Sequence, residues 1–396
     1  MQFLVSAGEA SGDLYASGTI EHLSRIEPGL SYYGCAGPRL QRAGVQAVVY
    51  AGDISVIGLA EVLGHLPRIY GEYRKLVQHA RKNRPVASLL TDNPDFNLRL
   101  ARHLKALGTP VFYLVAPQVW AWRQGRVKVI RELVDHLFCL FPFEEAWFRD
   151  RGVNATYIGH PLAQLVRPQL SREHFFATRR LHFDRPTIVL LPGSRGGEIA
   201  RHLPILLDTV ALMRSRFDVQ ALLAVSSGFG GQSAVFRFRE RIRALSIQVV
   251  ENETWEAIAH ADLALAASGT VTMEAAVLGT PMVTFYKVNP VSWHAGRHLV
   301  KAPFFSMVNL IAEEQIVPEL IQTEMTPAKL ASAATGLLTN DARAERMRRD
   351  LARVRQMLTL PHDPLAYAAR LISNAMQNVV PGVANAEGHF LQETIN

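Results

Sequence analysis

The chain has 396 residues, of which 48% are hydrophobic and 19% charged, so it holds enough apolar material for about two domains. Its formal net charge of +7 is a moderate excess that is compatible with an anionic partner but does not by itself indicate nucleic acid. No apolar stretch approaches the roughly 20 residues of a membrane span. The N-terminus has no basic segment and runs directly into a strand pattern, so we expect no signal peptide and a cytosolic protein.

Short apolar runs alternate with helical patterns along most of the chain. In the first half, strands are expected at 3–7, 32–36, 47–50, 86–91, 111–115 and 136–141, and helices after Asp13 and at 66–83, 98–107 and 123–134. In the second half, strands are expected at 188–191, 220–225, 247–250, 263–267 and 282–285. Near-continuous apolar strands separated by helices predict an α/β fold with parallel sheets covered on both faces. Cys35 and Cys139 fall in two of these apolar runs, which favours reduced core thiols over a disulfide or a metal site.

The pattern divides into two doubly wound, Rossmann-like domains facing a central cleft, with the connection near Gly159–Arg172. We place the N-terminal domain at residues 1–165 and the C-terminal domain at residues 166–359. Residues 326–377 have a helical pattern throughout, and the tail 379–396 is expected to be loosely ordered. His160 lies at the crossover, where a histidine that packs the hinge is the favoured interpretation.

The loop after the strand at 188–191 reads Pro192-Gly193-Ser194-Arg195-Gly196-Gly197, and a helical pattern follows. Strand, small-residue loop and helix together direct backbone N–H groups and a helix dipole at an anion, and the Arg195 fork suits phosphate oxygens. The loop is neither a P-loop nor a G-x-G-x-x-G fingerprint. An ordinary tight turn with a surface arginine is the alternative.

A second loop of the same kind, Ser268-Gly269-Thr270, follows the strand at 263–267. Its N–H and hydroxyl groups can bind a second phosphate, and Glu274, one turn into the next helix, can reach a ribose diol. The alternative is a first-turn glutamate favoured by the helix dipole. Two such loops in one domain are less expected by chance than one, which favours a nucleotide site.

Carboxylates follow two strands of the first half. Asp92 comes directly after the strand at 86–91 and is the candidate general base, whereas Asp95 is either functional or the cap of the next helix. The D-x-x-D spacing is no convincing metal site. Glu9 and Ser11 lie in the first loop, where Ser11 or Asp13 can also serve as a helix cap.

Aromatic and basic residues gather in three further places. Trp120 and Trp122 stand in the loop 116–122, where they either stack on a sugar, shield an acyl chain or pack between domains. One basic cluster comprises Arg68, Arg74, Lys75, Arg81, Lys82 and Arg84, and a second stretch carries Lys287, Trp293, Arg297, Lys301, Phe304, Phe305 and Met307. Such mixtures suit an anionic membrane surface, although a solvated helix face and core packing are the simpler alternatives.

The chain resembles the lipid-A-disaccharide synthases, inverting glycosyltransferases of the GT-B architecture. The resemblance runs in order from about residue 3 to about 375. It rests on Ala7-Gly8-Glu9-Ala10-Ser11-Gly12-Asp13, Ala36-Gly37-Pro38-Arg39, Asp95-Phe96-Asn97, Val119-Trp120-Ala121-Trp122-Arg123-Gln124, Ile158-Gly159-His160-Pro161, Leu191-Pro192-Gly193-Ser194-Arg195-Gly196, Ala267-Ser268-Gly269-Thr270, Lys287 and Asn309-Leu310.

The resemblance implies a reaction in lipopolysaccharide biosynthesis of Gram-negative bacteria. UDP-2,3-diacylglucosamine would donate its sugar, with inversion, to 2,3-diacylglucosamine 1-phosphate (lipid X), giving the β-1,6 disaccharide 1-phosphate and UDP. It further implies C-terminal helices (about 360–378) that cross back to the first domain, no bound metal or other cofactor, and a monomer or a dimer that exchanges C-terminal segments. The expected location is the cytoplasmic face of the inner membrane, by peripheral association, with no nucleic-acid partner.

The resemblance also assigns roles to residues. Asp92 would be the base, Arg195 would stabilise the departing UDP, and Glu9 and Ser11 would be needed for activity. The nucleotide-sugar site would comprise Gly193, Ser194, Arg195, Ser268, Gly269, Thr270, Glu274 and Asn309. The possible acceptor or acyl side would comprise Asp95, Gln118, Trp120 and Trp122.

The sequence departs from the family pattern at two positions. Gln118 stands where some relatives carry Ser and Asn93 where some carry Ala, which puts the acyl or sugar fit in doubt but removes no proposed catalytic group. Three alternatives stay open: a peptidoglycan N-acetylglucosaminyl transferase, a UDP-sugar 2-epimerase on the same fold, and an inactive binding module. The first would require a glycine-rich first loop, and the joint presence of Asp92, Arg195 and Glu274 argues against the last.

Overall fold

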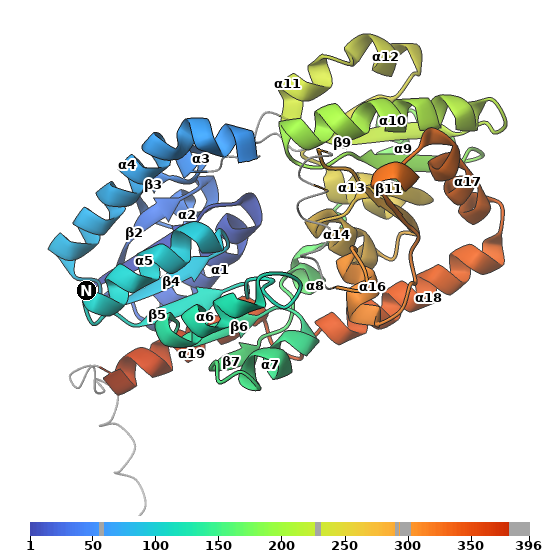
Figure 1. Ribbon diagram of the computed structural model, residues 1–396. Coiled ribbons are helices and arrows are strands. Elements are labelled where there is room, and N and C mark those ends of the chain that lie inside the picture. Colours follow the sequence, from blue (N-terminus) through green and yellow to red (C-terminus); the bar gives the residue numbers. More distant parts are fainter. Residues whose placement is uncertain (55–58, 226–230, 290–292, 294–301, 380–396) are drawn as a thin grey trace, which may run out of the picture.

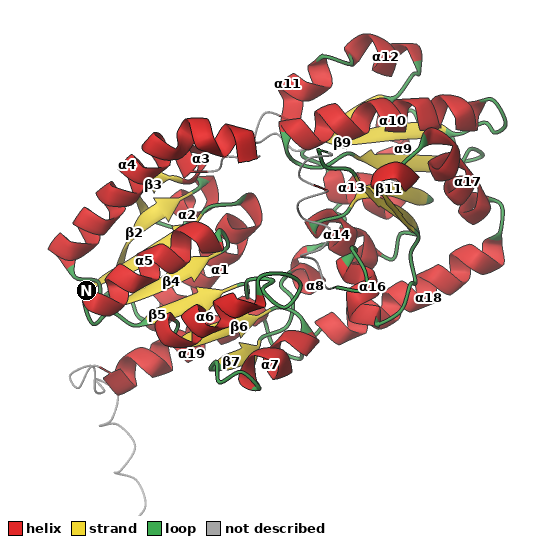
Figure 2. Ribbon diagram, in the orientation of Figure 1, coloured by secondary structure: helices red, strands yellow, loops and turns green. Residues whose placement is uncertain are grey.

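The computed structural model describes residues 1–54, 59–225, 231–289, 293 and 302–379, and it folds into two lobes, each built on a parallel sheet (Figure 1). Helices cover both faces of each sheet (Figure 2). The predicted α/β class with two Rossmann-like domains is confirmed. In the described part of the chain no helix is both long and apolar enough to cross a membrane.

The N-terminal sheet has seven strands in the order β3-β2-β1-β4-β5-β6-β7. They are β1 (Gln2–Ala7), β2 (Ser31–Ala36), β3 (Gln46–Tyr50), β4 (Ala87–Thr91), β5 (Val111–Leu114), β6 (His136–Cys139) and β7 (Ala155–Tyr157). The helices of this lobe are α1 (Ala10–Ile26), α2 (Pro38–Arg42), α3 (Ala51–Ile54), α4 (Leu59–Asn83), α5 (Pro94–Ala106), η1 (Gln124–Arg126), α6 (Val127–Leu133) and α7 (Pro142–Arg149). All the ladders are parallel, so the carboxyl ends of all seven strands lie at one edge.

The C-terminal sheet has six parallel strands in the order β10-β9-β8-β11-β12-β13. They are β8 (Thr187–Leu191), β9 (Gln220–Val225), β10 (Gln248–Glu251), β11 (Leu263–Ala267), β12 (Met282–Tyr286) and β13 (Glu319–Ile321). The helices are α8 (Leu162–Leu165), α9 (Arg172–Arg179), α10 (Gly196–Arg214), α11 (Gly231–Phe236), α12 (Arg239–Ala244), α13 (Thr254–His260), α14 (Thr270–Leu278), α16 (Met307–Ala312), η2 (Gln322–Glu324), α17 (Pro327–Leu338) and α18 (Asp341–Leu358). β8 and β11 are central and buried, and their carboxyl ends carry the two small-residue loops.

The last helix, α19 (Pro364–Val379), crosses back and packs against α1 of the N-terminal lobe (Figure 1). Ser373 Oγ donates to Glu27 Oε1 at 2.6 Å, and Leu365 is seated against Gly18. Two hydrogen bonds, from Tyr157 Oη to the Met357 carbonyl at 2.7 Å and from Gln164 Nε2 to the His362 carbonyl at 2.9 Å, hold the crossing segment. The Ser373 and Tyr157 bonds join this segment to the first lobe, and the Gln164 bond ties it to α8 at the connection between the lobes.

His160 is buried at this crossover, as expected for a hinge-packing residue. Its backbone N–H donates to the Leu358 carbonyl at 3.0 Å, and its ring lies 5.4 Å from Phe141 and 6.1 Å from Tyr15. Its Nδ1 accepts the Leu162 N–H at 3.2 Å, and burial lowers the pKa of the ring to about 3. The ring is therefore neutral at physiological pH and packs the connection.

Several sequence-based expectations need correction. Helix α5 starts at Pro94 instead of residue 98, and α4 starts at Leu59 instead of residue 66. Strands β7 and β13 were not expected. Asp13 does not cap α1: it accepts the N–H groups of Gly37, Arg39 and Leu40, and so caps α2. Ser11 lies inside the first turn of α1, whose cap position is Glu9. Most of the tail predicted at 379–396, and Arg297 and Lys301, lie outside the described residues.

Candidate functional site

The carboxyl ends of the two sheets bring loops from both lobes into contact. Arg195 Nη2, after β8, lies 3.2 Å from Glu9 Oε1, after β1. Gln118 Nε2, after β5, makes a weak 3.7 Å contact with Met307 Sδ of the opposite lobe. The candidate site therefore lies between the lobes, where the topology of doubly wound sheets places ligands.

Asp92 directly follows β4 and faces the β1 loop. Its Oδ1 accepts the Gly8 N–H at 2.8 Å, and its Oδ2 accepts the Glu9 N–H at 3.0 Å. A carboxylate offers about four lone-pair sites, so these two bonds orient the group and leave room for a substrate proton. Burial raises the pKa of Asp92 well above its ordinary value, and the negative charge of Glu9 adds to the rise. Asp92 is thus a stronger base than an exposed aspartate.

The Asp92 backbone is held in an uncommon conformation, with φ of 53° at Asp92 and 34° at Asn93. The Tyr113 hydroxyl donates to the Asp92 carbonyl at 2.5 Å, and Asn97 Nδ2 donates to the Thr91 and Asp92 carbonyls at 2.8 and 3.0 Å. Asn97 is in turn fixed by Ser6, whose Oγ donates to Asn97 Oδ1 at 2.7 Å. This support explains how the left-handed turn persists after a buried strand.

The Asp92 carboxylate fits closely against α1. A methyl group at Gly12 would lie 1.8 Å from Asp92 Oδ2, and one at Gly8 would lie 3.1 Å from Oδ1. Glycine at residue 12 therefore makes room for the carboxylate at the start of α1. The role of Gly12 was not evident from the sequence, because Asp92 is distant from it along the chain.

The Arg195 loop (residues 192–197) has the geometry of an anion-binding loop at a helix N-terminus. It passes from β8 through Gly193, whose φ is 115°, into the N-terminus of the 19-residue helix α10. Arg195 is partly exposed and lies 3.6 Å from Glu198 Oε1, which also accepts the Tyr286 hydroxyl at 3.0 Å. Gly193 and Ser194 flank Arg195 in the loop, and Ser194 is exposed.

The second loop, after β11, opens at the N-terminus of α14. Gly269 is the cap position, and Gly269 and Thr270 are exposed. The Ser268 hydroxyl, in contrast, donates to the Phe305 carbonyl at 2.9 Å. Backbone N–H groups at Gly269 and Thr270 are therefore better placed to meet an anion than the Ser268 side chain.

Glu274 lies one turn into α14 and is partly buried. Burial raises its pKa to about 7, and a hydrogen bond from Trp255 opposes the rise. Its charge also acts on Tyr15 of the opposite lobe, so the carboxyl group lies near the interface between the lobes. This placement fits a group that accepts hydroxyl donors from a bound sugar.

Asn309 differs from its expected role in the nucleotide-sugar site. The side chain is fully buried, and Nδ2 donates to the Val317 carbonyl at 2.9 Å and to Glu319 Oε1 at 2.8 Å. Oδ1 accepts the N–H groups of Ile316 and Val317, both at 2.9 Å. In this structure Asn309 holds the turn between α16 and β13, and its amide has no donor hydrogen left for a ligand.

Asp95, Trp120 and Trp122, which are expected on the acceptor side, differ in their exposure and in the contacts that their side chains already make. Asp95 is exposed and pairs with Arg126, and it lies 3.7 Å from Arg123. Trp120 packs edge-on against Phe143, with ring centres 5.0 Å apart, and its indole N–H donates to Glu144 Oε1 at 3.1 Å. Trp122 is 40% exposed, so it offers the more accessible aromatic surface.

Two polar residues behind the site were not singled out from the sequence. Glu144 is buried, and burial raises its pKa to about 8 while it anchors Trp120. His202 lies on the buried face of α10 and contacts both the Pro192 and the Lys287 carbonyl. For His202 a signal was present, because it is a polar residue at helical spacing from the apolar Ile199 and Leu206.

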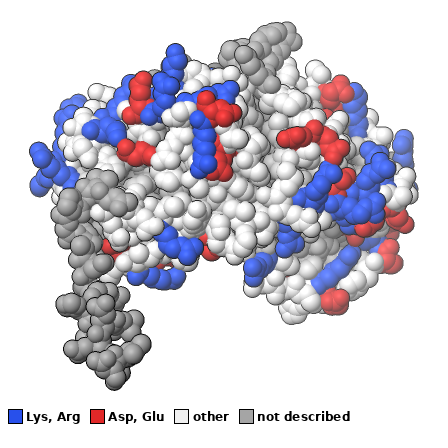
Figure 3. Space-filling model, turned by 90° about the horizontal axis from the view of Figure 1, so that it is seen from below, with Lys and Arg blue, Asp and Glu red and all other residues white. Residues whose placement is uncertain are grey.

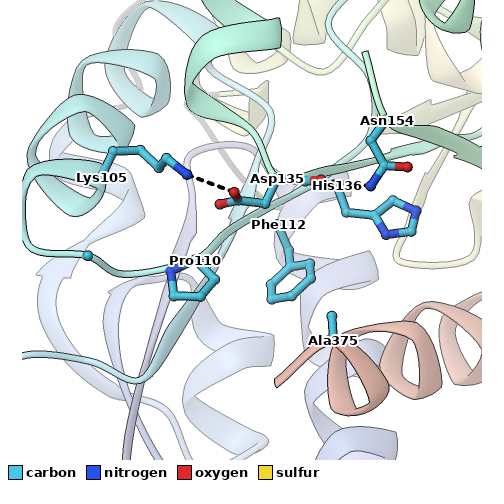
Figure 4. Close-up of a pocket in the computed structure, with 8 residues that line it drawn as sticks. Lys105, Pro110, Phe112, Asp135, His136, Asn154 and Ala375 are labelled. Carbon is cyan, nitrogen blue, oxygen red and sulfur yellow. Dashed lines mark hydrogen bonds and ion pairs between the residues drawn. The ribbon is translucent and has the colours of Figure 1, made fainter. Parts of the chain in front are cut away.

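A separate pocket lies at the opposite edge of the N-terminal sheet, beside α19 (Figure 4). Its lining includes Lys105, Asp135, His136, Asn154 and Ala375. The polar groups already bond within the protein: Lys105 Nζ to Asp135 Oδ1 at 2.7 Å, and His136 Nε2 with Thr156 Oγ1 at 2.8 Å. Because it lies at the opposite edge of the sheet, the pocket is distinct from the interdomain site. Among the described residues no cluster of three His, Cys, Asp or Glu side chains suits a metal ion.

The sequence matches a family model across most of its length. The model describes lipid-A-disaccharide synthetase and covers residues 3–365. The chain belongs to the lipid-A-disaccharide synthase family. A lipid-A-disaccharide synthase of Solibacter usitatus is 53% identical over 97% of this chain and 100% of its own length. Another from Anaeromyxobacter dehalogenans is 42% identical over 94% of this chain and 97% of its own.

Solved structures agree on the architecture of this synthase. A UDP-GlcNAc 2-epimerase from Neisseria meningitidis superposes with a TM-score of 0.63 at 11% identity, over 96% of this chain and 100% of that one. The calicheamicin glycosyltransferase CalG4 superposes with a TM-score of 0.57 at 16% identity, over 96% and 99%. At such low identity these structures show the fold alone, which is GT-B. The family assignment makes the chain a glycosyltransferase.

Proposed function

We propose that this synthase transfers 2,3-diacylglucosamine from UDP-2,3-diacylglucosamine to the 6-hydroxyl of 2,3-diacylglucosamine 1-phosphate, with inversion. The products are the β-1,6-linked disaccharide 1-phosphate and UDP. One observation carries the proposal: Glu9 contacts Asp92 through its backbone N–H at 3.0 Å and Arg195 through its side chain at 3.2 Å. A base and a cation for the leaving group thus converge from opposite lobes, as a displacement at C1 requires.

Asp92 removes the proton from the acceptor hydroxyl. Its raised pKa and its two N–H bonds supply a fixed, basic oxygen, and general-base catalysis of this kind contributes roughly 10²- to 10⁴-fold in rate. The proton passes to Asp92 as the acceptor oxygen attacks C1 from the face opposite the diphosphate. Inversion at C1 follows from this single displacement.

Arg195 and the N-termini of α10 and α14 receive the charge that develops on the departing UDP. Arginine offers a bidentate fork to phosphate oxygens, and the helix ends add backbone N–H donors from Gly196, Gly269 and Thr270. Glu274 accepts hydroxyl donors of the ribose. The residues of the C-terminal lobe therefore bind the nucleotide, and Asp92 of the N-terminal lobe acts on the acceptor.

The lipid character of both substrates supports peripheral association with an anionic membrane at the cytoplasmic face. The exposed basic cluster on and after α4 includes Arg74, Arg81 and Lys82, and it is only partly neutralised: Lys75 pairs with Glu72 at 3.0 Å and Arg68 pairs with Asp53. On the face shown in Figure 3, basic side chains form several separate groups beside acidic ones. The attraction is therefore expected to be moderate and sensitive to salt.

Incubation with UDP-2,3-diacylglucosamine and 2,3-diacylglucosamine 1-phosphate tests the reaction, with disaccharide and UDP quantified separately. Wild type should form both in equal amounts, and Asp92→Asn and Arg195→Ala should form little of either. Turnover of UDP-N-acetylglucosamine without disaccharide formation would instead support an epimerase or another transferase. Flotation with anionic liposomes at low and high salt tests the location, and absence of binding at both would remove the membrane claim.

A further inference from the structure

His202 is a fully buried histidine that connects the Arg195 loop (residues 192–197) with the end of β12. It lies on α10, about two turns after Arg195, and both of its ring nitrogens have partners. Nδ1 is 2.7 Å from the Pro192 carbonyl oxygen. Nε2 is 3.2 Å from the Lys287 nitrogen and 3.1 Å from the Lys287 carbonyl oxygen. The ring also packs on Phe285 and Tyr286, at 5.4 and 5.6 Å between centres.

These contacts define the tautomer that joins the two segments. A carbonyl oxygen only accepts, so the bond to Pro192 places the single proton of the neutral ring on Nδ1. Nε2 then accepts the Lys287 N–H and makes no hydrogen bond to the Lys287 carbonyl oxygen. Burial lowers the pKa of the ring, so the neutral form prevails at physiological pH. Glu198 favours the protonated ring and Arg201 opposes it.

The location of Pro192 makes this bond relevant to Arg195. Pro192 is the last residue before Gly193, whose φ of 115° turns the chain into the loop. Glycines and a serine surround Arg195, so the loop has few side chains with which to fix itself. The His202 ring, supported by α10 and by two aromatic rings, connects the start of the loop to Lys287. Arg201 Nη1 donates to the same Lys287 carbonyl at 3.3 Å.

We propose that His202 is a positioning residue: by bonding Pro192 and Lys287 it holds the Arg195 loop in the geometry that receives the diphosphate. The inference rests on the proposed function, in which this loop binds the leaving UDP. His202 does not touch the substrate, since its side chain is fully buried behind the loop. The effect of a substitution at His202 on UDP binding should therefore depend on which of the two hydrogen bonds the new side chain retains.

Three substitutions separate the two bonds. His202→Asn places an amide nitrogen where Nδ1 stands and can keep the Pro192 bond, His202→Gln reaches toward Lys287 instead, and His202→Leu keeps neither. UDP affinity is measured by calorimetry and kcat and KM by disaccharide formation, with thermal unfolding in parallel. The matched control is His260→Leu, because His260 is also buried in this lobe but bonds Leu170 and Glu256, away from the loop.

His202→Leu loses both bonds, and we expect loss of the Pro192 bond to weaken UDP binding about tenfold, with a higher KM for the donor. His202→Asn should bind UDP within about threefold of wild type, and His202→Gln should resemble the leucine variant. His260→Leu should lower the unfolding temperature without changing UDP affinity.

The outcomes also separate this inference from the proposed function. If Arg195→Ala binds UDP as well as wild type does, the loop is no diphosphate site and the proposed function fails. If Arg195→Ala weakens binding but folded His202→Leu does not, the positioning role is overturned. If His202→Leu does not fold, the Asn and Gln variants decide, and equal affinities in the two overturn the inference.

Discussion

The Glu9 carboxylate lies 3.2 Å from the Arg195 guanidinium across the boundary between the lobes. In the proposed mechanism the Arg195 guanidinium binds the diphosphate of the donor, but in this structure it is paired with Glu9. The same residue donates its backbone N–H to Asp92, and its charge contributes to the raised pKa of that base. We expect the diphosphate of the donor to displace the Glu9 side chain from Arg195, which would leave the Glu9 charge unpaired beside Asp92.

This competition predicts that Glu9→Gln strengthens UDP binding. An ion pair between partly exposed side chains contributes about 0.2–1 kcal/mol, so its removal should tighten UDP binding by up to about fivefold. Calorimetric titration with UDP measures the effect, and Glu21→Gln on the exposed face of α1 is the matched control. Weaker UDP binding in Glu9→Gln would show that Glu9 supports the nucleotide site instead of competing for it.

The assignment of Asp92 predicts a separation between binding and turnover. Asp92→Asn should lower kcat by roughly 10²- to 10⁴-fold, because the amide cannot take up the acceptor proton. UDP affinity should change little, since Asp92 belongs to the opposite lobe. Comparable losses in kcat and UDP affinity would point to a folding defect, and full turnover would make Glu9 or Asp95 the candidate base.

The pH profile gives an independent test of the same group. Asp92 must be ionised to act as base, and its pKa is raised above the ordinary aspartate value. Activity should therefore fall as the pH decreases through this raised pKa, and the acid limb should lie at higher pH than an unperturbed aspartate would produce. Glu9→Gln removes a neighbouring negative charge, so its acid limb in kcat/KM should shift to lower pH. An unchanged limb would exclude electrostatic coupling between the two carboxyl groups.

The sequence was sufficient where the signal is local. Strands β9 and β11 occupy the predicted residues because continuous apolar runs and buried parallel strands coincide there. β7 and β13 were missed because each has three residues and both are partly exposed, so they lack an apolar run. The loops that hold Glu9, Asp92 and Arg195 were identifiable, because parallel topology places strand ends at one edge.

The contacts within the site were not predictable from local pattern. The sequence suggested that Asp13 caps its own helix, but Asp13 caps α2. The Asn309 amide uses its hydrogen bonds on the turn that follows it in the chain. The Glu9–Arg195 pair depends on how the two lobes meet, which no hydrophobic periodicity encodes. Polar contacts between residues that are distant in the sequence therefore could not be predicted from the sequence alone.

Gly12→Ala tests whether the close fit of α1 against Asp92 matters. The added methyl group would lie 1.8 Å from Asp92 Oδ2, so the carboxylate has to move and lose its N–H bonds from Gly8 or Glu9. We expect kcat to fall by at least about tenfold, while UDP affinity stays near that of wild type. Gly29→Ala is the control, because a methyl group there meets no atom within 4 Å. Equal turnover in the two variants would show that Asp92 adapts without loss.

Above neutral pH, Glu274→Gln should bind UDP more weakly than wild type but should be more stable toward unfolding. Burial raises the Glu274 pKa to about 7 in the folded protein, whereas the unfolded chain has the ordinary value of 4.5. The folded state therefore binds the proton more tightly, and stability is lost as the pH rises from about 4.5 through 7, by about 3 kcal/mol at most. Glutamine keeps an acceptor for Trp255 without the buried charge.

Urea unfolding at pH 5 and pH 8 measures this difference. The variant should unfold at higher urea than wild type at pH 8 and at a similar concentration at pH 5, because the wild-type carboxyl is then largely protonated in the folded state. UDP affinity at pH 8 should fall by about tenfold, since the amide replaces a charged acceptor for the ribose hydroxyls. Equal stability of the two proteins at pH 8 would contradict the buried charge, and unchanged UDP affinity would remove Glu274 from the nucleotide site.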